Sequence, residues 1–358
     1  MMKFTKAYLF LFLLLPLLTV TVHAQESELP SAPIYIDNKP ISTKYLIRNG
    51  HLLVPAIFLK HTGAFVDWNE THRAVVVHTK DKMFSMPMGK KYTDDFIRAT
   101  NTWKRNPLSI ETVDFNGVPY VPLVDVAEKL NMDVRYDAAQ SRTHITTHIP
   151  GVQNRLDRAK TSQKLVALTF DDGPEARYTP RILDALKKKA APATFFVMGK
   201  QVQSYPEIMK RIVTEGHGIG NHTWGHPNLA KTWSAQVKEE IRRTQNELQR
   251  VTGRKSDLFR PPFGELTKSD LLILHELGMK TIMWSVDTLD WSGLSAEEIV
   301  DVVEREITPG GIVLQHNFQY GNEGLLEGTV AAIPKIVDEL RARGYTFVTV
   351  QTLLESQR

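Results

Sequence analysis

The second half of the chain alternates short apolar runs of strand length with longer helical segments. Strands are expected at residues 165–170, 193–197, 218–221, 258–260, 280–286, 311–314 and 346–350. Helices are expected between them, at residues 180–189, 205–215, 234–252, 269–277, 296–307 and 330–343. Strands separated by helices form right-handed parallel βαβ units. This half therefore predicts an α/β fold, a distorted (β/α)7-8 barrel somewhat smaller than the ~250 residues of a full eightfold barrel.

Two copies of a different pattern lie before it, 67 or 68 residues apart. Each copy starts with Asn-Gly between apolar runs (49–55 and 116–122) and continues with an amphipathic stretch (56–62 and 123–130). A triplet ending in an aromatic residue (66–68 and 134–136) and an alternating run (74–78 and 142–146) follow. Asn-Gly is a strong hairpin signal because both residues tolerate positive φ. Each copy predicts a hairpin, a helix and a strand pair, and together they predict a small α+β repeat domain.

The first 24 residues have the pattern of a secretory signal. Lys3 and Lys6 precede an apolar run at residues 7–22, and Val22-His23-Ala24 places small residues at the two positions that a signal peptidase reads. We expect a signal peptide at residues 1–24 and export of the rest. A retained membrane anchor is the alternative, although sixteen apolar residues are short of the ~20 that span a bilayer.

Length and composition divide the exported part into two domains. A polar spacer is expected at residues 25–33, the repeat domain at 34–150, a linker with a short helix at 151–163, and the barrel domain at 164–358. The chain has no Cys, which excludes disulfides and thiol chemistry. The formal net charge is +4, and no Lys/Arg cluster is interleaved with aromatic residues, so we expect no nucleic-acid partner. The oligomeric state is not indicated.

Polar residues gather after the strands of the barrel, where parallel α/β folds place reactive groups. Asp171 and Asp172 follow the first strand, and neighbouring carboxylates repel each other unless a cation or Arg compensates. His222 and His226 follow the third strand, and two His four residues apart can share a metal from one side of a helical turn. Alone, the acidic pair could be an ordinary turn and the His pair structural. Together they offer three ligands and a spare carboxylate.

Five ordered segments complete this set: residues 169–174 (TFDDGP), 222–226 (HTWGH), 260–263 (RPPF), 287–291 (DTLDW) and 314–316 (LQH). They resemble the five motifs of the polysaccharide deacetylase family, also known as NodB-homology or carbohydrate esterase family 4 enzymes. The resemblance extends over residues 164–354. It implies that the barrel is the catalytic domain.

The resemblance also implies roles for single residues. The implied metal ligands are Asp172, His222 and His226. Asp171 would be the general base and His316 the general acid. Arg260 would orient and tune Asp171, and Asp290 would do the same for His316. Two imidazoles and a carboxylate suit Zn²⁺, although Co²⁺, Ni²⁺ or Mn²⁺ fit the same ligands.

Three further residues would bind substrate. The backbone N–H of Phe263 would stabilise the oxyanion, while Trp291 and Leu314 would form the walls of a pocket for the acetyl methyl group. Phe263 stands where the family often has Tyr, which matters little for a backbone role. Asn317 follows His316 where Asp is frequent, so the tuning of the acid could differ. Asp287, the first acidic residue of its motif, is left without a catalytic role.

The activity implied is metal-dependent N-deacetylation of N-acetylglucosamine residues in a cell-wall polysaccharide, with release of acetate by a secreted, wall-associated enzyme. Peptidoglycan is the first choice of substrate, followed by chitin or chitooligosaccharides and then by acetylxylan. A base and an acid with separate pKa values predict a bell-shaped pH profile. The alternative outside enzymes is an inactive carbohydrate-binding wall protein, and a small-molecule amidohydrolase is disfavoured by the signal and the extra domain.

The repeat domain resembles the N-terminal domain of copper amine oxidases over residues 34–148. This name implies no copper here, because the His residues of the region form no ligand-like cluster in sequence, and we expect them to be structural. The sequence does not indicate whether this domain binds the wall or the substrate. Core packing is favoured for the aromatic residues Trp68, Trp103, Tyr120 and Tyr136, and a sugar-stacking platform is the alternative.

Overall fold

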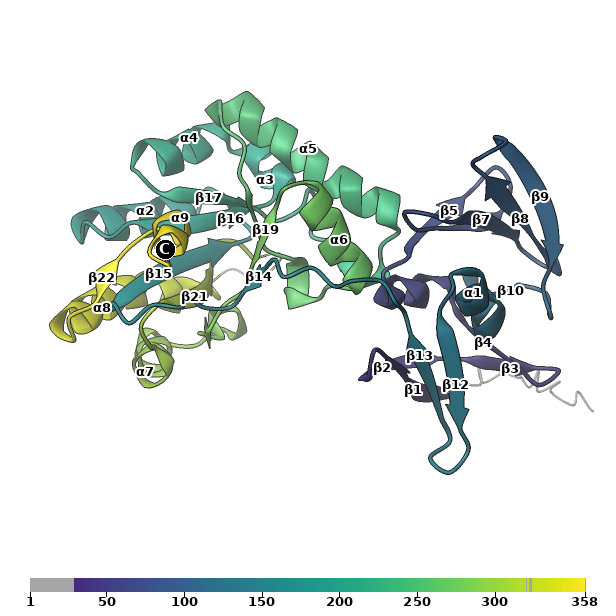
Figure 1. Cartoon of the computed structure of the whole chain (residues 1–358). Helices are drawn as coiled ribbons and strands as arrows, with labels where there is room; N and C mark the ends of the chain where they lie inside the picture. Colours follow the sequence, from purple (N-terminus) through teal and green to yellow (C-terminus); the bar gives the residue numbers. More distant parts are fainter. Residues whose placement is uncertain (1–28, 320, 322–323, 358) are drawn as a thin grey trace, which may run out of the picture.

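The computed structural model describes residues 29–319, 321 and 324–357. It has a β-rich N-terminal part and an α/β C-terminal part. The two parts meet where helices α5 (Ser234–Thr252) and α6 (Lys268–Glu276) approach the N-terminal part (Figure 1). The predicted signal peptide, residues 1–24, lies outside the described residues. Among the helices of the described part, none is long and apolar enough to cross a membrane.

The N-terminal part contains three sheets. One has the order β12-β13-β1-β2, formed by Asp133–Asp137, Arg142–Thr146, Ser31–Ile36 and Lys39–Lys44. The second has the order β10-β11-β4-β3, formed by Val113–Phe115, Val118–Pro122, His51–Pro55 and Leu46–Arg48. The third is the meander β5 to β9, formed by Phe65–Asn69, Ala74–His78, Met83–Pro87, Tyr92–Ile97 and Thr102–Pro107.

The repeat prediction is confirmed in its main features. The hairpins β3–β4 and β10–β11 turn at Asn49-Gly50 and Asn116-Gly117, with positive φ at all four residues (46°, 79°, 52° and 77°). The helix of the second copy is α1 (Leu123–Lys129), whereas that of the first is the 3₁₀ helix η1 (Ala56–Thr62). Strands β7 to β9 were not predicted, and β1 begins at Ser31, before the expected start at Ile34.

The C-terminal part is built on one parallel sheet, which confirms the distorted barrel. Its order is β14-β19-β18-β17-β16-β15-β21-β20, with β22 beside β15. The strands are Arg155–Leu156, Lys280–Ile282, Leu258–Phe259, Gly218–Asn221, Ala193–Val197, Leu165–Asp171, Gly311–His316, Val286–Asp287 and Thr346–Phe347. The single strand expected at residues 280–286 is two strands: β19 pairs with β18 and β14, whereas β20 pairs with β21.

The helices pack around this sheet. They are α2 (Thr179–Lys188), α3 (Gly199–Ser204), α4 (Pro206–Thr214), α5 (Ser234–Thr252), α6 (Lys268–Glu276), α7 (Ala296–Glu306), α8 (Glu327–Ala342) and α9 (Val350–Glu355). Short 3₁₀ helices η2 (Leu229–Lys231), η3 (Pro262–Gly264) and η4 (Asp290–Ser292) lie after β17, β18 and β20. Helix α3 was not predicted, and the last predicted strand ends early because α9 begins at Val350.

The predicted linker is also part of the barrel. Instead of a short helix, residues 151–163 contain strand β14, which pairs in parallel with β19 through Arg155↔Thr281 and Leu156↔Ile282. Leu156 packs against an apolar cluster that includes Ile282 and Leu258. This burial and the free edge of β19 explain why a polar segment becomes a strand.

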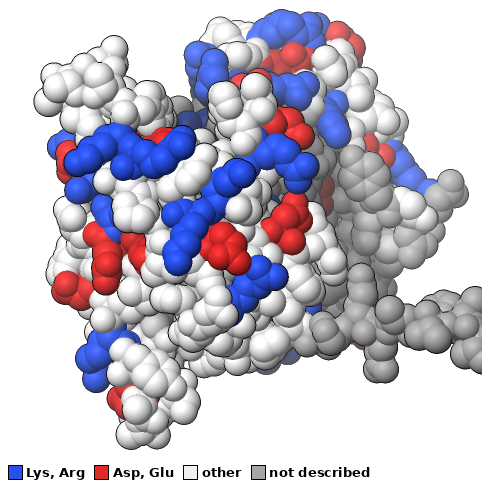
Figure 2. All heavy atoms as spheres, turned by 90° about the vertical axis from the view of Figure 1, so that its right-hand side faces the viewer, with Lys and Arg blue, Asp and Glu red and all other residues white. Residues whose placement is uncertain are grey.

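Figure 2 looks onto the N-terminal part and shows Lys and Arg side chains interspersed with Asp and Glu. The aromatic residues proposed for a platform do not share one surface. Tyr120 is buried in β11, while Trp103 of β9 and Tyr136 of β12 are exposed on different sheets. Core packing is therefore confirmed for Tyr120, but it is wrong for Trp103 and Tyr136, whose side chains are exposed. The four residues form no common platform within the described residues.

Candidate active site

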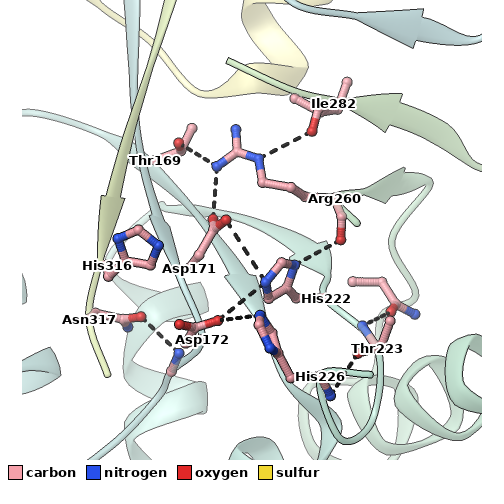
Figure 3. Close-up of polar contacts among 12 residues, drawn as sticks. Thr169, Asp171, Asp172, His222, Thr223, His226, Arg260, Ile282, His316 and Asn317 are labelled. Atoms are coloured by element: carbon pink, nitrogen blue, oxygen red, sulfur yellow. Dashed lines mark hydrogen bonds and ion pairs between the residues drawn. The ribbon is translucent and has the colours of Figure 1, made fainter. Parts of the chain in front are cut away.

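The carboxyl ends of the barrel strands surround a pocket of about 580 Å³. Eight of the predicted site residues line it: Asp171, Asp172, His222, His226, Phe263, Trp291, Leu314 and His316. Arg260 and Asp290 lie fully buried behind the pocket, each bonded to one of its lining residues. All ten predicted residues are thus brought into one site. Figure 3 labels six of them: Asp171, Asp172, His222, His226, Arg260 and His316.

The strand register explains this convergence. Asp171 at the end of β15 is the Cα partner of His316 at the end of β21. Asn221, the residue before His222, is the partner of Phe259, the residue before Arg260. Parallel strands end at the same edge of a sheet, so motifs far apart in sequence come together at one end of the barrel.

Three potential ligand atoms face one another. Asp172 Oδ1 lies 3.2 Å from His222 Nε2 and 3.3 Å from His226 Nε2. Asp172 Oδ1 is buried and lacks a hydrogen-bond partner among the described residues. His222 Nδ1 donates to the carbonyl oxygen of Arg260 (2.8 Å), which leaves its Nε2 free to bind a metal. The donor set and its unpaired oxygen fit a divalent cation.

The His pair does not lie on a helical turn, as the sequence suggested. Thr223 and His226 have positive φ (66° and 61°), and the segment is an irregular loop after β17. The His226 N–H donates to Thr223 Oγ1 (3.0 Å), which closes the loop and brings the two imidazole centroids within 4.9 Å. The prediction of proximity was right, but its helical rationale was wrong, because local side-chain bonds replace the helix.

Burial and charge act against each other in this cluster. Burial lowers the pKa of His222, but the Asp171 and Asp172 carboxylates outweigh it and the net pKa is raised. Burial would raise the pKa of Asp172, but His222 reverses this and lowers it. Burial and the nearby His222 charge lower the pKa of His226 to about 4. The cluster therefore combines an anionic carboxylate with a neutral imidazole, as metal ligation requires.

A buried guanidinium holds the other carboxylate. Arg260 Nη1 donates to Asp171 Oδ1 (2.8 Å) and to Thr169 Oγ1 (2.7 Å). Arg260 Nε and Nη2 donate to the carbonyl oxygens of Ile282 (3.1 Å) and Met283 (2.8 Å). Asp171 Oδ2 is left to face the metal-ligand cluster, 4.0 Å from His222 Nε2. The arrangement fixes the direction of the Asp171 carboxylate.

His316 has a carboxylate partner of its own. Its Nδ1 donates to Asp290 Oδ1 (2.7 Å), and its backbone N–H donates to Asp290 Oδ2 (2.8 Å). Thr329 Oγ1 donates to the same Oδ2 (2.8 Å). Burial lowers the pKa of His316, but the charge and hydrogen bond of Asp290 outweigh it and raise the pKa to about 9. The ring is therefore held protonated at neutral pH.

The walls of the pocket are apolar and partly exposed. Phe263 has a φ of 60° and packs edge-on against His226 at 4.7 Å between centroids. Trp291 and Phe263 are about half exposed or more, whereas Leu314 is buried. Asp287, which was given no role, also lines the pocket and accepts a hydrogen bond from the Leu289 N–H.

Sequence reasoning missed some supporting residues. Thr169 could have been found, since strand alternation places it on the same face of β15 as Asp171. Glu240 gave no such signal. It lies on α5, and its Oε2 accepts from the backbone N–H groups of Trp224 (2.9 Å) and Gly225 (2.8 Å), between the two imidazoles.

Comparison with known proteins gives the same class. Residues 158–282 match the polysaccharide deacetylase family model, and residues 34–146 match the copper amine oxidase N-terminal domain model. Over 193 residues the chain is 42% identical to a peptidoglycan-N-acetylglucosamine deacetylase of Bacillus cereus, covering 54% of this chain and 69% of that protein. It is 36% identical to the peptidoglycan-N-acetylmuramic acid deacetylase PdaC of Bacillus subtilis, covering 55% of this chain and 40% of that protein.

Among solved structures, the Bc1960 peptidoglycan N-acetylglucosamine deacetylase is similar with a TM-score of 0.54 and 39% identity. The superposition covers 57% of this chain and 94% of that one. The parallel barrel and the site at its carboxyl end thus define a deacetylase of the carbohydrate esterase family 4 type. The chain belongs to the polysaccharide deacetylase family, with a copper amine oxidase N-terminal-like domain before the catalytic domain.

Proposed function

We propose that the protein is a metal-dependent N-deacetylase that removes acetyl groups from N-acetylglucosamine residues of cell-wall peptidoglycan. The observation that carries this proposal is one pocket lined by a three-ligand cluster, an Arg-held carboxylate and an Asp-held imidazole. The named activities of the Bacillus relatives support the choice of peptidoglycan. The proposed site of action is the wall, outside the cell, reached through the signal peptide expected at residues 1–24.

Asp172, His222 and His226 would hold the metal, with zinc the first choice for this ligand set. When bound, the metal supplies positive charge that polarises the acetyl carbonyl and acidifies water. Asp171 Oδ2, the carboxylate oxygen that Arg260 leaves free, would accept the proton of the attacking water. The Phe263 N–H would donate to the developing oxyanion.

His316 would deliver a proton to the amine nitrogen as the C–N bond breaks. An amine is a poor leaving group unless it is protonated, so the acid must carry its proton at working pH. Asp290 supports this by accepting from Nδ1, which directs the proton of Nε2 toward the pocket. Trp291 and Leu314 would bound the space for the acetyl methyl group.

Acetate release from purified wall glycan, chitooligosaccharides and acetylxylan, measured in parallel, tests the proposal. We expect release from wall glycan to be fastest and to be abolished in D171N and H316A. Faster release from chitooligosaccharides or acetylxylan would reassign the substrate. Product analysis by mass spectrometry would separate N-acetylglucosamine from N-acetylmuramic acid as the sugar that loses its acetyl group.

The competing proposal is an inactive wall-binding protein. It predicts that the purified protein binds the wall but carries almost no metal. It also predicts that D171N binds the wall as the wild type does, and that neither protein releases acetate. Metal content measured by mass spectrometry and acetate release measured on the same sample distinguish the two.

A further inference from the structure

A lysine of the N-terminal domain is completely buried in the deacetylase domain. Lys60, on η1, has no exposed side-chain surface. Its Nζ donates to the carbonyl oxygens of Leu229 (2.6 Å) and Thr232 (2.7 Å) and pairs with Asp270 Oδ1 at 2.7 Å. Two carbonyl oxygens and one carboxylate thus surround the ammonium group. A buried charge with this complement of partners fixes the groups around it.

Two of these partners belong to the loop that follows a proposed metal ligand. Leu229 is the first residue of the short helix η2, three positions after His226, and Thr232 directly follows the end of this helix. The loop has its own turn bonds, from the Ala230 N–H to Asn228 Oδ1 (3.0 Å) and from Thr232 Oγ1 to the Asn228 carbonyl (2.8 Å). Lys60 ties both ends of this turn to the N-terminal domain.

A second contact reaches the same loop through helix α5. The Asp67 carboxylate, on β5 of the N-terminal domain, accepts from the Ala235 N–H at the start of α5 (2.6 Å). Ser234 Oγ accepts from the Val66 N–H (2.9 Å). Trp233, the residue before the helix, makes no side-chain cap of its own among the described residues. Asp67 therefore supplies the anionic cap that the N-terminus of a helix favours.

Helix α5 in turn holds the segment between the two imidazoles. Glu240 on α5 accepts from the backbone N–H groups of Trp224 and Gly225. The loop from His222 to Thr232 is thus held on one side by Glu240 and on the other by Lys60. Lys60 belongs to the N-terminal domain, and Glu240 lies on a helix whose N-terminus is capped by that domain.

Apolar packing makes the contact continuous. Phe65 of the N-terminal domain lies in an apolar cluster with Leu229, Val237 and Ile241 of the deacetylase domain. Trp233 packs in the opposite direction, against the core of the N-terminal domain. Each domain therefore packs an aromatic side chain against the other, Phe65 buried and Trp233 partly buried, which opposes rigid-body motion between them.

We propose that the N-terminal domain is a positioning part of the metal site, and that Lys60 and Asp67 are positioning residues for the loop that carries His222 and His226. The expected effect on metal binding rests on the proposed function. The claim that the N-terminal domain immobilises residues 222–232 does not depend on any metal or substrate.

The test uses the full mature chain with K60M, D67A and the control K129M. Lys129 also lies in the N-terminal domain and pairs with a carboxylate, Asp95, at 2.8 Å, but among the described residues it makes no hydrogen bond or ion pair with the deacetylase domain. Amide hydrogen exchange of peptides covering residues 222–232 is measured without metal. We expect at least about tenfold faster exchange in K60M and D67A than in wild type and K129M. Unchanged exchange in both variants would overturn the proposal.

Zinc release to a chromogenic chelator gives the second readout. Supports outside the ligands of a metal site change affinity by about 10-fold to 100-fold, so we expect K60M to release zinc at least about tenfold faster than K129M. Wild-type protein that binds no zinc would contradict the proposed function, while the exchange result would still decide the positioning role.

A double variant separates positioning from stability. K60M alone leaves Asp270 unpaired and buried, whereas K60M/D270N removes the uncompensated charge. Both remove the Lys60 donor from the carbonyl groups of Leu229 and Thr232. We expect the double variant to regain thermal stability but to keep fast zinc release and fast exchange. Recovery of all three together would show that Lys60 only stabilises the fold, and would overturn the positioning role.

Discussion

Arg260 illustrates how much of this site depends on the shape of one side chain. Its planar guanidinium bonds simultaneously to Asp171, Thr169 and the carbonyl oxygens of Ile282 and Met283. Lys cannot reproduce this, because its ammonium group is a single point with three donors on a flexible stem. The Asp171 carboxylate would then lose its fixed direction.

We therefore expect R260K to lower kcat/KM by about 10²-fold with little change in KM, measured by acetate release under saturating metal. Circular dichroism would verify that the variant is folded. A kcat/KM within threefold of wild type, taken as an order-of-magnitude limit, would contradict the role of the guanidinium fork.

His316 makes the alkaline limit of activity predictable. A general acid works only while protonated, so activity present below its pKa is lost as pH rises through about 9. The charges facing it are Asp290, Asp171 and Asp172, with Asp290 the largest of the three. D290N removes that charge, and we expect the alkaline limb of kcat to move down by about 1–3 pH units.

The pH profile of D290N against wild type checks this, and H316A should lack the alkaline limb. D287N serves as a control, because Asp287 lines the same pocket but is not among the charges that raise the His316 pKa. If the alkaline limb of kcat lies at the same pH in D290N as in the wild type, a group other than His316 must cause it.

At the scale of elements, the two Asn-Gly hairpins determine how the N-terminal repeat begins. Gly117 has a φ of 77°, and an added methyl group there would meet no atom of the described residues within 4 Å. Substitution by Ala therefore carries a conformational penalty alone, without a steric clash. Gly151 has the same open surroundings among described residues but no positive φ.

We expect G117A to lower the free energy of unfolding by about 1 kcal/mol, since a left-handed conformation disfavours a side chain. G151A should lie within about 0.5 kcal/mol of wild type, as usual for an exposed substitution. Urea denaturation of both variants measures the difference. Equal stability would mean that the turn does not require its left-handed backbone.

The loop that carries His222 and His226 shows a limit of sequence reasoning about elements. The i, i+4 spacing of His222 and His226 predicted a helical turn, yet Thr223 and His226 adopt positive φ and the loop closes through a side-chain bond. The two imidazoles nevertheless lie close together. The residue spacing did not determine the backbone conformation, because hydrogen bonds to the side chains of Thr223 and of Glu240, which lies on another element, determine it.

At the scale of the whole molecule, the two domains share buried groups. Lys60 and Asp270 pair across the interface without exposed side-chain surface, and removal of one partner of such a pair destabilises by about 3–5 kcal/mol. We expect calorimetry of the full chain to show one cooperative unfolding transition. G117A, although confined to the N-terminal domain, should lower the temperature of that single transition.

Two separated transitions, with only the first shifted by G117A, would show that the domains unfold independently. That outcome would contradict the expectation that the interface makes the two domains unfold together.

The sequence by itself predicted most strands and helices of the barrel, the hairpins of the repeat and the ten residues that the structure brings together at one pocket. Periodicity, turn chemistry and ordered motifs depend on residues close together in the chain, so they can be recognised from the sequence alone. Only the tertiary structure decided that residues 151–163 add strand β14, that residues 280–286 divide between β19 and β20, and that Lys60 is buried beside the loop that carries His222 and His226. These outcomes depend on which partner a segment meets in space. A charged or polar segment becomes a strand or a buried ion pair only when a distant element supplies the matching donors and acceptors.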